Sequence, residues 1–243
     1  MATPTPEPRY NLDEWAADTD LGRRVFNYNY TMTGTELPGW ELVKTVDMAP
    51  EQSLTERLYI WEKKGSDGRQ LIRVGITETY EWRRAQAQLQ TQLVYSMRPD
   101  IPRGKGKIAK IGDVSYAAQP EDAKSVASVL FTRGNLSVSI NSVGEEVVDV
   151  SVVASKLDRT FTEPPAKKDL QKERAEDRSP KPIKLKKNER KRLLEALPER
   201  VPRSGWIKII VPDGEVIRED DSLVYVSAKA GSKAVAEFVV MQE

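Results

Sequence analysis

The side chains of this chain that could do chemistry are mostly carboxylates. The 243 residues include 37 aspartates and glutamates but no histidine and no cysteine. Without imidazole or thiol groups, Ser-His-Asp and Cys-His catalysis are excluded within the chain, and a zinc site would need carboxylates alone. We therefore predict no catalytic residue, no metal site and no cofactor.

Paired carboxylates are the remaining route to hydrolysis, because two acids that face each other can cleave a glycosidic bond. The evident pairs, Glu145-Glu146 and Asp220-Asp221, are neighbours in the sequence. Neighbouring side chains of a strand point to opposite faces, so these pairs do not by themselves form an acid and a base. A carboxylate-based hydrolase acting on glycans stays open as an alternative, and it predicts two facing acids with a perturbed pKa.

Three polar or aromatic side chains are candidates for non-covalent binding. Arg133 and Asn135 flank Gly134 in "FTRGNLSVSI", between two apolar runs. Glycine and asparagine tolerate positive φ, so this segment predicts a hairpin turn with Arg133 exposed at a strand end. A plain chain reversal is the favoured interpretation, and a polar pair presented to a ligand is the alternative. Trp61, close to a second hairpin, could stack on a sugar.

A cluster of basic residues lies in the segment "KPIKLKKNERKRLL". Its members are Lys181, Lys184, Lys186, Lys187, Arg190, Lys191 and Arg192. Such a cluster could contact anionic lipid or an acidic partner. Nucleic acid is not expected, because the net charge is only +1 and no aromatic residues interleave the cluster. A solvated linker with a short helix is the favoured interpretation.

The elements that would position these residues follow from hydrophobic periodicity. Apolar residues alternate with polar ones in "LIRVGI" and "LSVSI", which predicts strands with one buried face and one face toward water. A helix is expected over 81–97, with Trp82, Ala85, Leu89 and Leu93 along one stripe. A second helix is expected within 144–159, on the helical spacing of Val147, Val150, Ala154 and Leu157.

These elements predict an α+β fold in which two helices cover an antiparallel sheet. Three strands followed by a helix occur twice, as in a β-β-β-α duplication. The layout predicted along the chain is a disordered tether (1–9), an α+β domain (10–160), a charged linker with a short helix (161–200) and a small β-rich unit (201–243). The last of these contains clearly alternating segments such as "LVYVSA".

A family resemblance accompanies this pattern. Within residues 36–160 the segments "IGDVSYAA", "VLFTRGNLSVSI" and "VVASKLDR" follow one another in this order. Their order resembles that in bacterial extracytoplasmic lipoproteins and sensor domains. The resemblance implies an outward-facing, non-enzymatic domain, and it adds Asp113 and Tyr116 to the candidate binding positions Arg133 and Asn135. The segment 201–243 resembles a short bacterial immunoglobulin-like module.

The function expected from these observations is non-catalytic. We predict an interaction module that binds a protein or a glycan through hairpin tips or sheet edges, located in the periplasm or at the cell surface. The Thr/Pro-rich start "MATPTPEPRY" favours a tether behind a removed signal or anchor, and an ordinary disordered terminus of a cytoplasmic protein is the alternative. No apolar run reaches the ~20 residues of a membrane span. A cytoplasmic structural or membrane-surface protein that uses the basic cluster is the other alternative.

Overall fold

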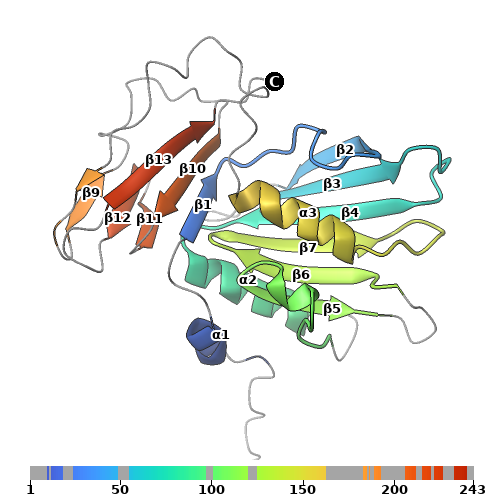
Figure 1. Cartoon of the computed structure of the whole chain (residues 1–243), viewed down its shortest axis with the longest axis horizontal. Helices are drawn as coiled ribbons and strands as arrows, with labels where there is room; N and C mark the ends of the chain where they lie inside the picture. The colour runs from blue at the N-terminus through green and yellow to red at the C-terminus, as the bar shows by residue number, and fades with distance from the viewer. Residues whose placement is uncertain are drawn as a thin grey trace, which may run out of the picture.

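The main feature of the computed structural model is a six-stranded antiparallel sheet, which confirms the α+β class (Figure 1). Its strand order is β2-β3-β4-β7-β6-β5. The strands are β2 (Trp40–Met48), β3 (Thr55–Lys63), β4 (Leu71–Glu78), β5 (Val114–Ala118), β6 (Ser128–Arg133) and β7 (Leu136–Ser142). The structure describes residues 10, 12–18, 24–48, 55–96, 101–119, 125–162, 183–184, 186, 189–192, 206–211, 215–219, 222–226 and 233–239.

The two longest helices lie on opposite faces of this sheet (Figure 1). We call the first face the one that carries the cross-strand row Tyr59, Val74, Ile140, Val129 and Ala117. The second face carries the row Leu58, Gly75, Ser139, Leu130 and Tyr116. Helix α3 (Ser151–Thr162) covers the first face, and helix α2 (Trp82–Val94) lies on the second.

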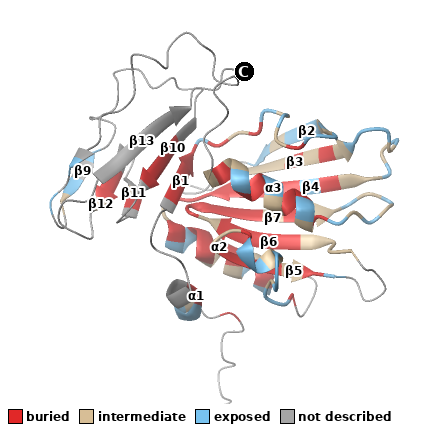
Figure 2. Cartoon of the chain, viewed as in Figure 1, coloured by how far each residue is buried: buried red, intermediate tan, exposed pale blue. Residues whose placement is uncertain are grey.

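The first face carries the main hydrophobic core. The alternation predicted in "LIRVGI" and "LSVSI" is confirmed on this face, and most of β4 and β7 is buried (Figure 2). The buried apolar members are Ile72, Val74, Ile76, Leu136, Val138 and Ile140. From α3, the side chains of Ala154, Leu157 and Phe161 complete this core. Burial of such side chains, at ~1.5–3 kcal/mol each, is the main source of stability in a sheet of this kind.

The stripe predicted on the helix after β4 is also confirmed. Trp82, Ala85, Leu89 and Leu93 are buried in α2. Leu89 and Leu93 pack against strands β5 and β6, together with Trp15 of the short helix α1 (Leu12–Asp18). Helix α2 therefore contacts mainly the β5–β7 half of the second face.

Helix α3 begins later than predicted. The prediction placed Val147 in the helix, whereas the structure starts α3 at Ser151 and leaves the Val147 side chain 53% exposed. The backbone N–H of Val148 donates to the Ser142 hydroxyl, and that of Val150 donates to the Val126 carbonyl. These bonds hold the preceding chain along the sheet, so its valines do not enter the helix.

The remaining strands form two small sheets beside the large one (Figure 1). The first has the order β1-β10-β13-β8 and the second β11-β12-β9. Their bounds are β1 Arg24–Tyr28, β8 Ile183–Lys184, β9 Arg190–Arg192, β10 Trp206–Val211, β11 Glu215–Glu219, β12 Ser222–Val226 and β13 Lys233–Val239. Strand β1 pairs antiparallel with β10, so the segments 10–160 and 201–243 contribute to one sheet.

The helix expected in the linker is not found in the described residues between 183 and 192. Instead β8 pairs with β13, and β9 pairs with β12. The backbone groups of this charged segment thereby gain partners on neighbouring strands, which removes the advantage of a helix. The predicted tether 1–9 and the leucines of 193–200 lie outside the described residues. No helix in the described part of the chain is long and apolar enough to cross a membrane.

Candidate functional site

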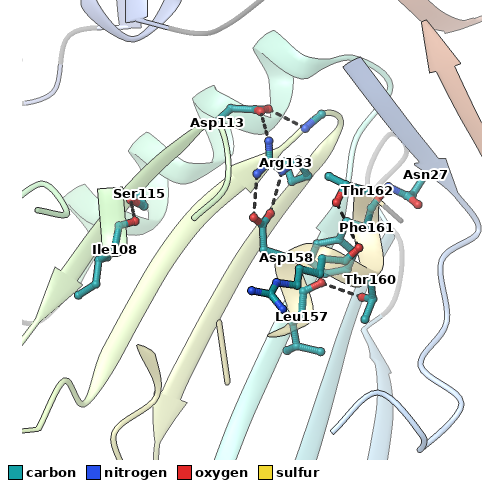
Figure 3. A network of polar contacts seen from close by, with 12 residues as sticks. Asn27, Ile108, Asp113, Ser115, Arg133, Leu157, Asp158, Thr160, Phe161 and Thr162 are labelled. Atoms are coloured by element: carbon teal, nitrogen blue, oxygen red, sulfur yellow. Dashed lines mark hydrogen bonds and ion pairs between the residues drawn. The ribbon is translucent and has the colours of Figure 1, made fainter. Parts of the chain in front are cut away.

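The hairpin between β6 and β7 is present, but its arginine is not presented to solvent (Figure 3). Gly134 has φ +55° at the turn. Arg133 Nε and Nη2 donate hydrogen bonds of 2.7 Å each to the two carboxylate oxygens of Asp158 in α3. Arg133 Nη1 donates to Asp113 Oδ1 at 2.9 Å, and the Gly134 N–H donates to Asp113 Oδ2 at 2.7 Å.

The prediction of an exposed Arg133 is therefore wrong, since its side chain is only 21% exposed. Burial disfavours the charged guanidinium, but the hydrogen bonds and charges of Asp158 and Asp113 outweigh that effect and raise the pKa of Arg133. A bidentate arginine–carboxylate pair of this kind is strong and directional. The pair links α3 to the end of β6. The carboxylates of Asp158 and Asp113 are thus both engaged by Arg133.

Asn135, the other polar residue of the turn, connects the large sheet to β1. Its side chain is fully buried. Its Oδ1 accepts from the Asn27 N–H at 2.8 Å, and its Nδ2 donates to the carbonyls of Asn27 at 2.7 Å and Thr79 at 3.0 Å. The Asn135 side-chain amide thus bonds both backbone groups of Asn27, as a neighbouring strand would. All of its hydrogen bonds are therefore made within the protein.

The end of α3 is held by the same small sheet (Figure 3). The fully buried Lys208 of β10 donates from Nζ to the Thr160 carbonyl at 2.7 Å, and Asn27 Nδ2 donates to the Phe161 carbonyl at 3.1 Å. Helix C-terminal carbonyls lack partners within the helix and favour a nearby cation. This joint therefore satisfies the end of α3.

The other two predicted binding residues lie apart from this network. Tyr116 is on the second face, where its hydroxyl accepts from Trp15 Nε1 at 2.9 Å and burial raises its pKa. Trp61 is fully buried in the first-face core. The structure thus brings Asp113, Arg133 and Asn135 together, and it leaves Tyr116 and Trp61 elsewhere. All five make internal contacts.

Part of the predicted basic cluster lies in the described residues. Lys184, Lys186, Arg190 and Arg192 are exposed there, and Lys191 belongs to β9. Lys181 and Lys187 lie outside the described residues. Contact of this cluster with an anionic membrane stays a prediction.

The second face of the large sheet holds a cleft that the sequence did not reveal. The cleft has a volume of about 540 Å³ and lies between the C-terminal end of α2 and strands β3 to β7. Its lining includes Arg73, Ser139 and Asn141 from the sheet and Gln92 and Tyr95 from the helix side. The volume falls within the ~300–1,000 Å³ that is typical of ligand sites.

Polar and apolar side chains share the floor of this cleft, the apolar ones being Leu58, Ile101, Ala118, Ala127 and Leu130. Ser128 Oγ donates to Asn141 Oδ1 at 2.7 Å, which fixes the amide of Asn141. Within the described residues, Asn141 Nδ2 has no protein acceptor and Arg73 has no carboxylate partner. In the middle of the sheet, a Cβ on Gly75 would lie 2.7 Å from Ser139 Oγ. Glycine at position 75 therefore leaves space around the Ser139 hydroxyl.

The wall above this floor carries an exposed aromatic ring. Tyr95 follows the last residue of α2 and is 82% exposed. Glu56 is the only carboxylate among the described residues that line the cleft. No group of three or more acids that could hold a metal ion was found in the described part of the chain. The described lining of the cleft therefore offers hydrogen bonding, apolar contact and ring stacking, with one carboxylate among its residues.

The sequence contained one signal for this site. The alternation of Ser137, Ser139 and Asn141 in β7 marked a polar face, which we interpreted as facing water. In the structure Ser137 is fully buried beside Gln92 of α2, with 3.3 Å between Ser137 Oγ and Gln92 Oε1. Periodicity showed which face is polar, whereas only the packing of α2 shows which part of it is open.

Comparison of the chain with protein-family models, with curated proteins and with solved structures found no match.

Proposed function

We propose that this chain is a non-catalytic recognition module that binds a protein or glycan partner in the cleft on the second face of its large sheet. One observation carries the proposal. Helix α2 covers only part of the β5–β7 half of that face and leaves Arg73 of β4 and Ser139 and Asn141 of β7 in an open cleft. Accessible polar groups on a rigid sheet are what specific binding requires. Among the described lining residues Glu56 is the single carboxylate, which supports binding without hydrolysis.

An extracytoplasmic location is part of the proposal. It is supported by the resemblance of residues 36–160 to bacterial lipoproteins and sensor domains. Cell fractionation of the source organism with an antibody against the protein checks it. Recovery in the cytoplasmic fraction alone would contradict this part of the proposal.

Filling the cleft tests the binding function. The substitution Ser139→Tyr places a large side chain on the floor, whereas Thr91→Tyr adds the same ring on an exposed position of α2 and serves as the matched control. The full chain and both variants are applied to an immobilised glycan array and a random-peptide display library. We expect binders that the wild type and Thr91→Tyr retain and Ser139→Tyr loses.

Two outcomes would overturn the proposal. The first is the absence of any binder in both collections, and the second is that Ser139→Tyr retains all of them. Release of reducing sugar from a bound glycan would show that the protein is an enzyme. Near-ultraviolet circular dichroism of Ser139→Tyr establishes that its core is intact before binding is compared.

A further inference from the structure

Two cations of the second face lie in one cross-strand row. That row consists of Lys44, Ile60, Arg73, Asn141 and Ser128 on β2, β3, β4, β7 and β6. Cross-strand neighbours share a face, so both cations of this row project from the second face. The carboxylate of the cleft, Glu56, lies four residues along β3 from Ile60, about 13 Å away at strand spacing. Glu62 lies on the same face, two residues from Ile60 and diagonal to Arg73. Its carboxylate accepts from the Gly68 N–H at 2.7 Å and forms no ion pair with Arg73 among the described residues.

Arg73 is the cation of this row that lines the cleft, and it is exposed. A guanidinium presents a planar fork of donors that matches a carboxylate. Arg133 of the same chain shows the bidentate pairing that results when a carboxylate is in reach, with two bonds of 2.7 Å to Asp158. No carboxylate of the described residues pairs with Arg73, so its fork is available to an acidic ligand.

The floor beside Arg73 fits sugar hydroxyls. The hydroxyl of Ser139 can both donate and accept, and Asn141 Nδ2 donates, as the hydroxyl groups of a sugar require. The ring of Tyr95, 82% exposed, offers a rigid apolar surface to the C–H face of a sugar. The combination joins a carboxylate site, a hydroxyl site and a stacking platform in one cleft.

A peptide fits this cleft less well. Strand addition requires an unpaired strand edge, but β4 and β7 are interior strands whose backbone groups are paired on both sides. Anchoring by apolar side chains requires a continuous apolar pocket, whereas Gly75 and Ser139 separate Leu58 from Leu130 across this floor. The cleft therefore favours a ligand whose own surface is covered with hydroxyl groups.

We propose that the cleft binds an acidic oligosaccharide, with a sugar carboxylate on Arg73, sugar hydroxyls on Ser139 and Asn141, and a ring stacked on Tyr95. This inference rests on the proposed function and names its ligand class.

The test uses the full chain and a panel of uronate oligosaccharides, each paired with its carboxyl-reduced neutral form. Isothermal titration calorimetry measures the affinity. We expect at least one uronate ligand to bind, and its neutral form to bind about tenfold more weakly or worse, since losing a charge-assisted bidentate pair removes at least ~1.4 kcal/mol. Arg73→Gln should lower affinity for the acidic form by a similar factor and leave the neutral form unchanged.

Matched variants separate the cleft from general charge and surface effects. Tyr95→Ala should weaken binding several-fold, whereas Val94→Ala, at the neighbouring exposed position, should not. Arg84→Gln removes an exposed arginine elsewhere on α2 and should also leave affinity unchanged. Thermal unfolding of every variant checks that the fold is retained.

Several results would overturn the inference. They are the absence of binding to every uronate ligand, equal affinity for acidic and neutral forms, no effect of Arg73→Gln, and equal competition by an oligoglutamate peptide. If a neutral glycan or a peptide binds and Ser139→Tyr abolishes that binding, the acidic-sugar inference fails while the proposed function stands. If uronate binding survives Ser139→Tyr, both fail.

Discussion

The two faces of the six-stranded sheet are built from the same strands but differ in chemistry and cover. On β7 the side chains of Leu136, Val138 and Ile140 are fully buried on the first face. On the second face, the alternate positions of the strand are serines and an asparagine, and only part of them lies under α2. The first face supplies stability, and the second leaves room for a ligand.

This difference follows from how each face gains its cover. Helix α3 and the chain around Tyr30, Met32 and Leu37 pack on the first face, so a continuous apolar layer is removed from water. On the second face α2 lies over part of strands β5 to β7, and Arg73 and Ser139 line the cleft beside its C-terminal end. Substitutions on the two faces should therefore have opposite consequences: loss of stability on the first and loss of binding on the second.

The largest expected effect is on the first face. Trp61→Ala should lower the free energy of unfolding by about 3–5 kcal/mol, because it leaves a cavity in a fully buried core. Leu58→Ala, on the second face of the same strand β3, should lower the free energy of unfolding by about 1 kcal/mol or less, since Leu58 is only partly buried. Urea unfolding followed by circular dichroism measures both. Equal losses would show that the two faces do not differ in this way.

The two arginines give the next largest contrast. Arg133→Gln leaves the carboxylates of Asp113 and Asp158 without their shared cation, and should cost about 2–3 kcal/mol, below the ~3–5 kcal/mol of a fully buried pair. Arg73→Gln should change the unfolding free energy by no more than ~0.5 kcal/mol. Chemical denaturation at neutral pH compares them. A stability loss for Arg73→Gln as large as that for Arg133→Gln would mean that the second face is also structural.

The smallest effect concerns the alkaline limit of the fold. Burial raises the pKa of both Tyr30 and Tyr59, which lie in the first-face core, above the ordinary value of 10.0. The folded state thus favours the neutral phenols. Their contribution to stability is fully present below the unfolded-state pKa and is lost as the pH rises toward the higher folded-state values.

A titration of tyrosinate absorbance, read together with circular dichroism, measures this effect. We expect a late-ionising fraction that appears only as the fold opens, and the double substitution Tyr30→Phe with Tyr59→Phe should remove it. Ionisation of every tyrosine near pH 10, with the circular dichroism unchanged, would contradict the prediction.

Much of the large sheet could be predicted because its local patterns are strong. Period-two alternation identified the buried members of β4 and β7, and period 3.6 identified the stripe of α2, since each pattern reflects one face of a single element. The start of α3 could not be predicted in this way, because bonds from Val148 and Val150 to the sheet decide where that helix begins.

The candidate site was harder to predict than the fold. Arg133 and Asn135 were candidate binding residues because they are polar and lie at a turn. In the structure Arg133 is hydrogen-bonded to Asp158 of α3, and Asn135 to Asn27 of β1. These partners are 25 and 108 residues away in the sequence, so no local pattern reveals them. The cleft residues Arg73 and Ser139, in turn, looked like ordinary solvent-facing positions.

The sequence by itself determined the period of each main element, the polarity of each face, and the absence of histidine and cysteine chemistry, because these depend on residue type and local spacing alone. Only the tertiary structure decided that β1 joins β10, that Arg133 is enclosed, and that α2 stops short of Arg73. The physical reason is that burial and hydrogen-bond partners at these positions come from segments far away in the chain, whose meeting depends on packing of the whole molecule.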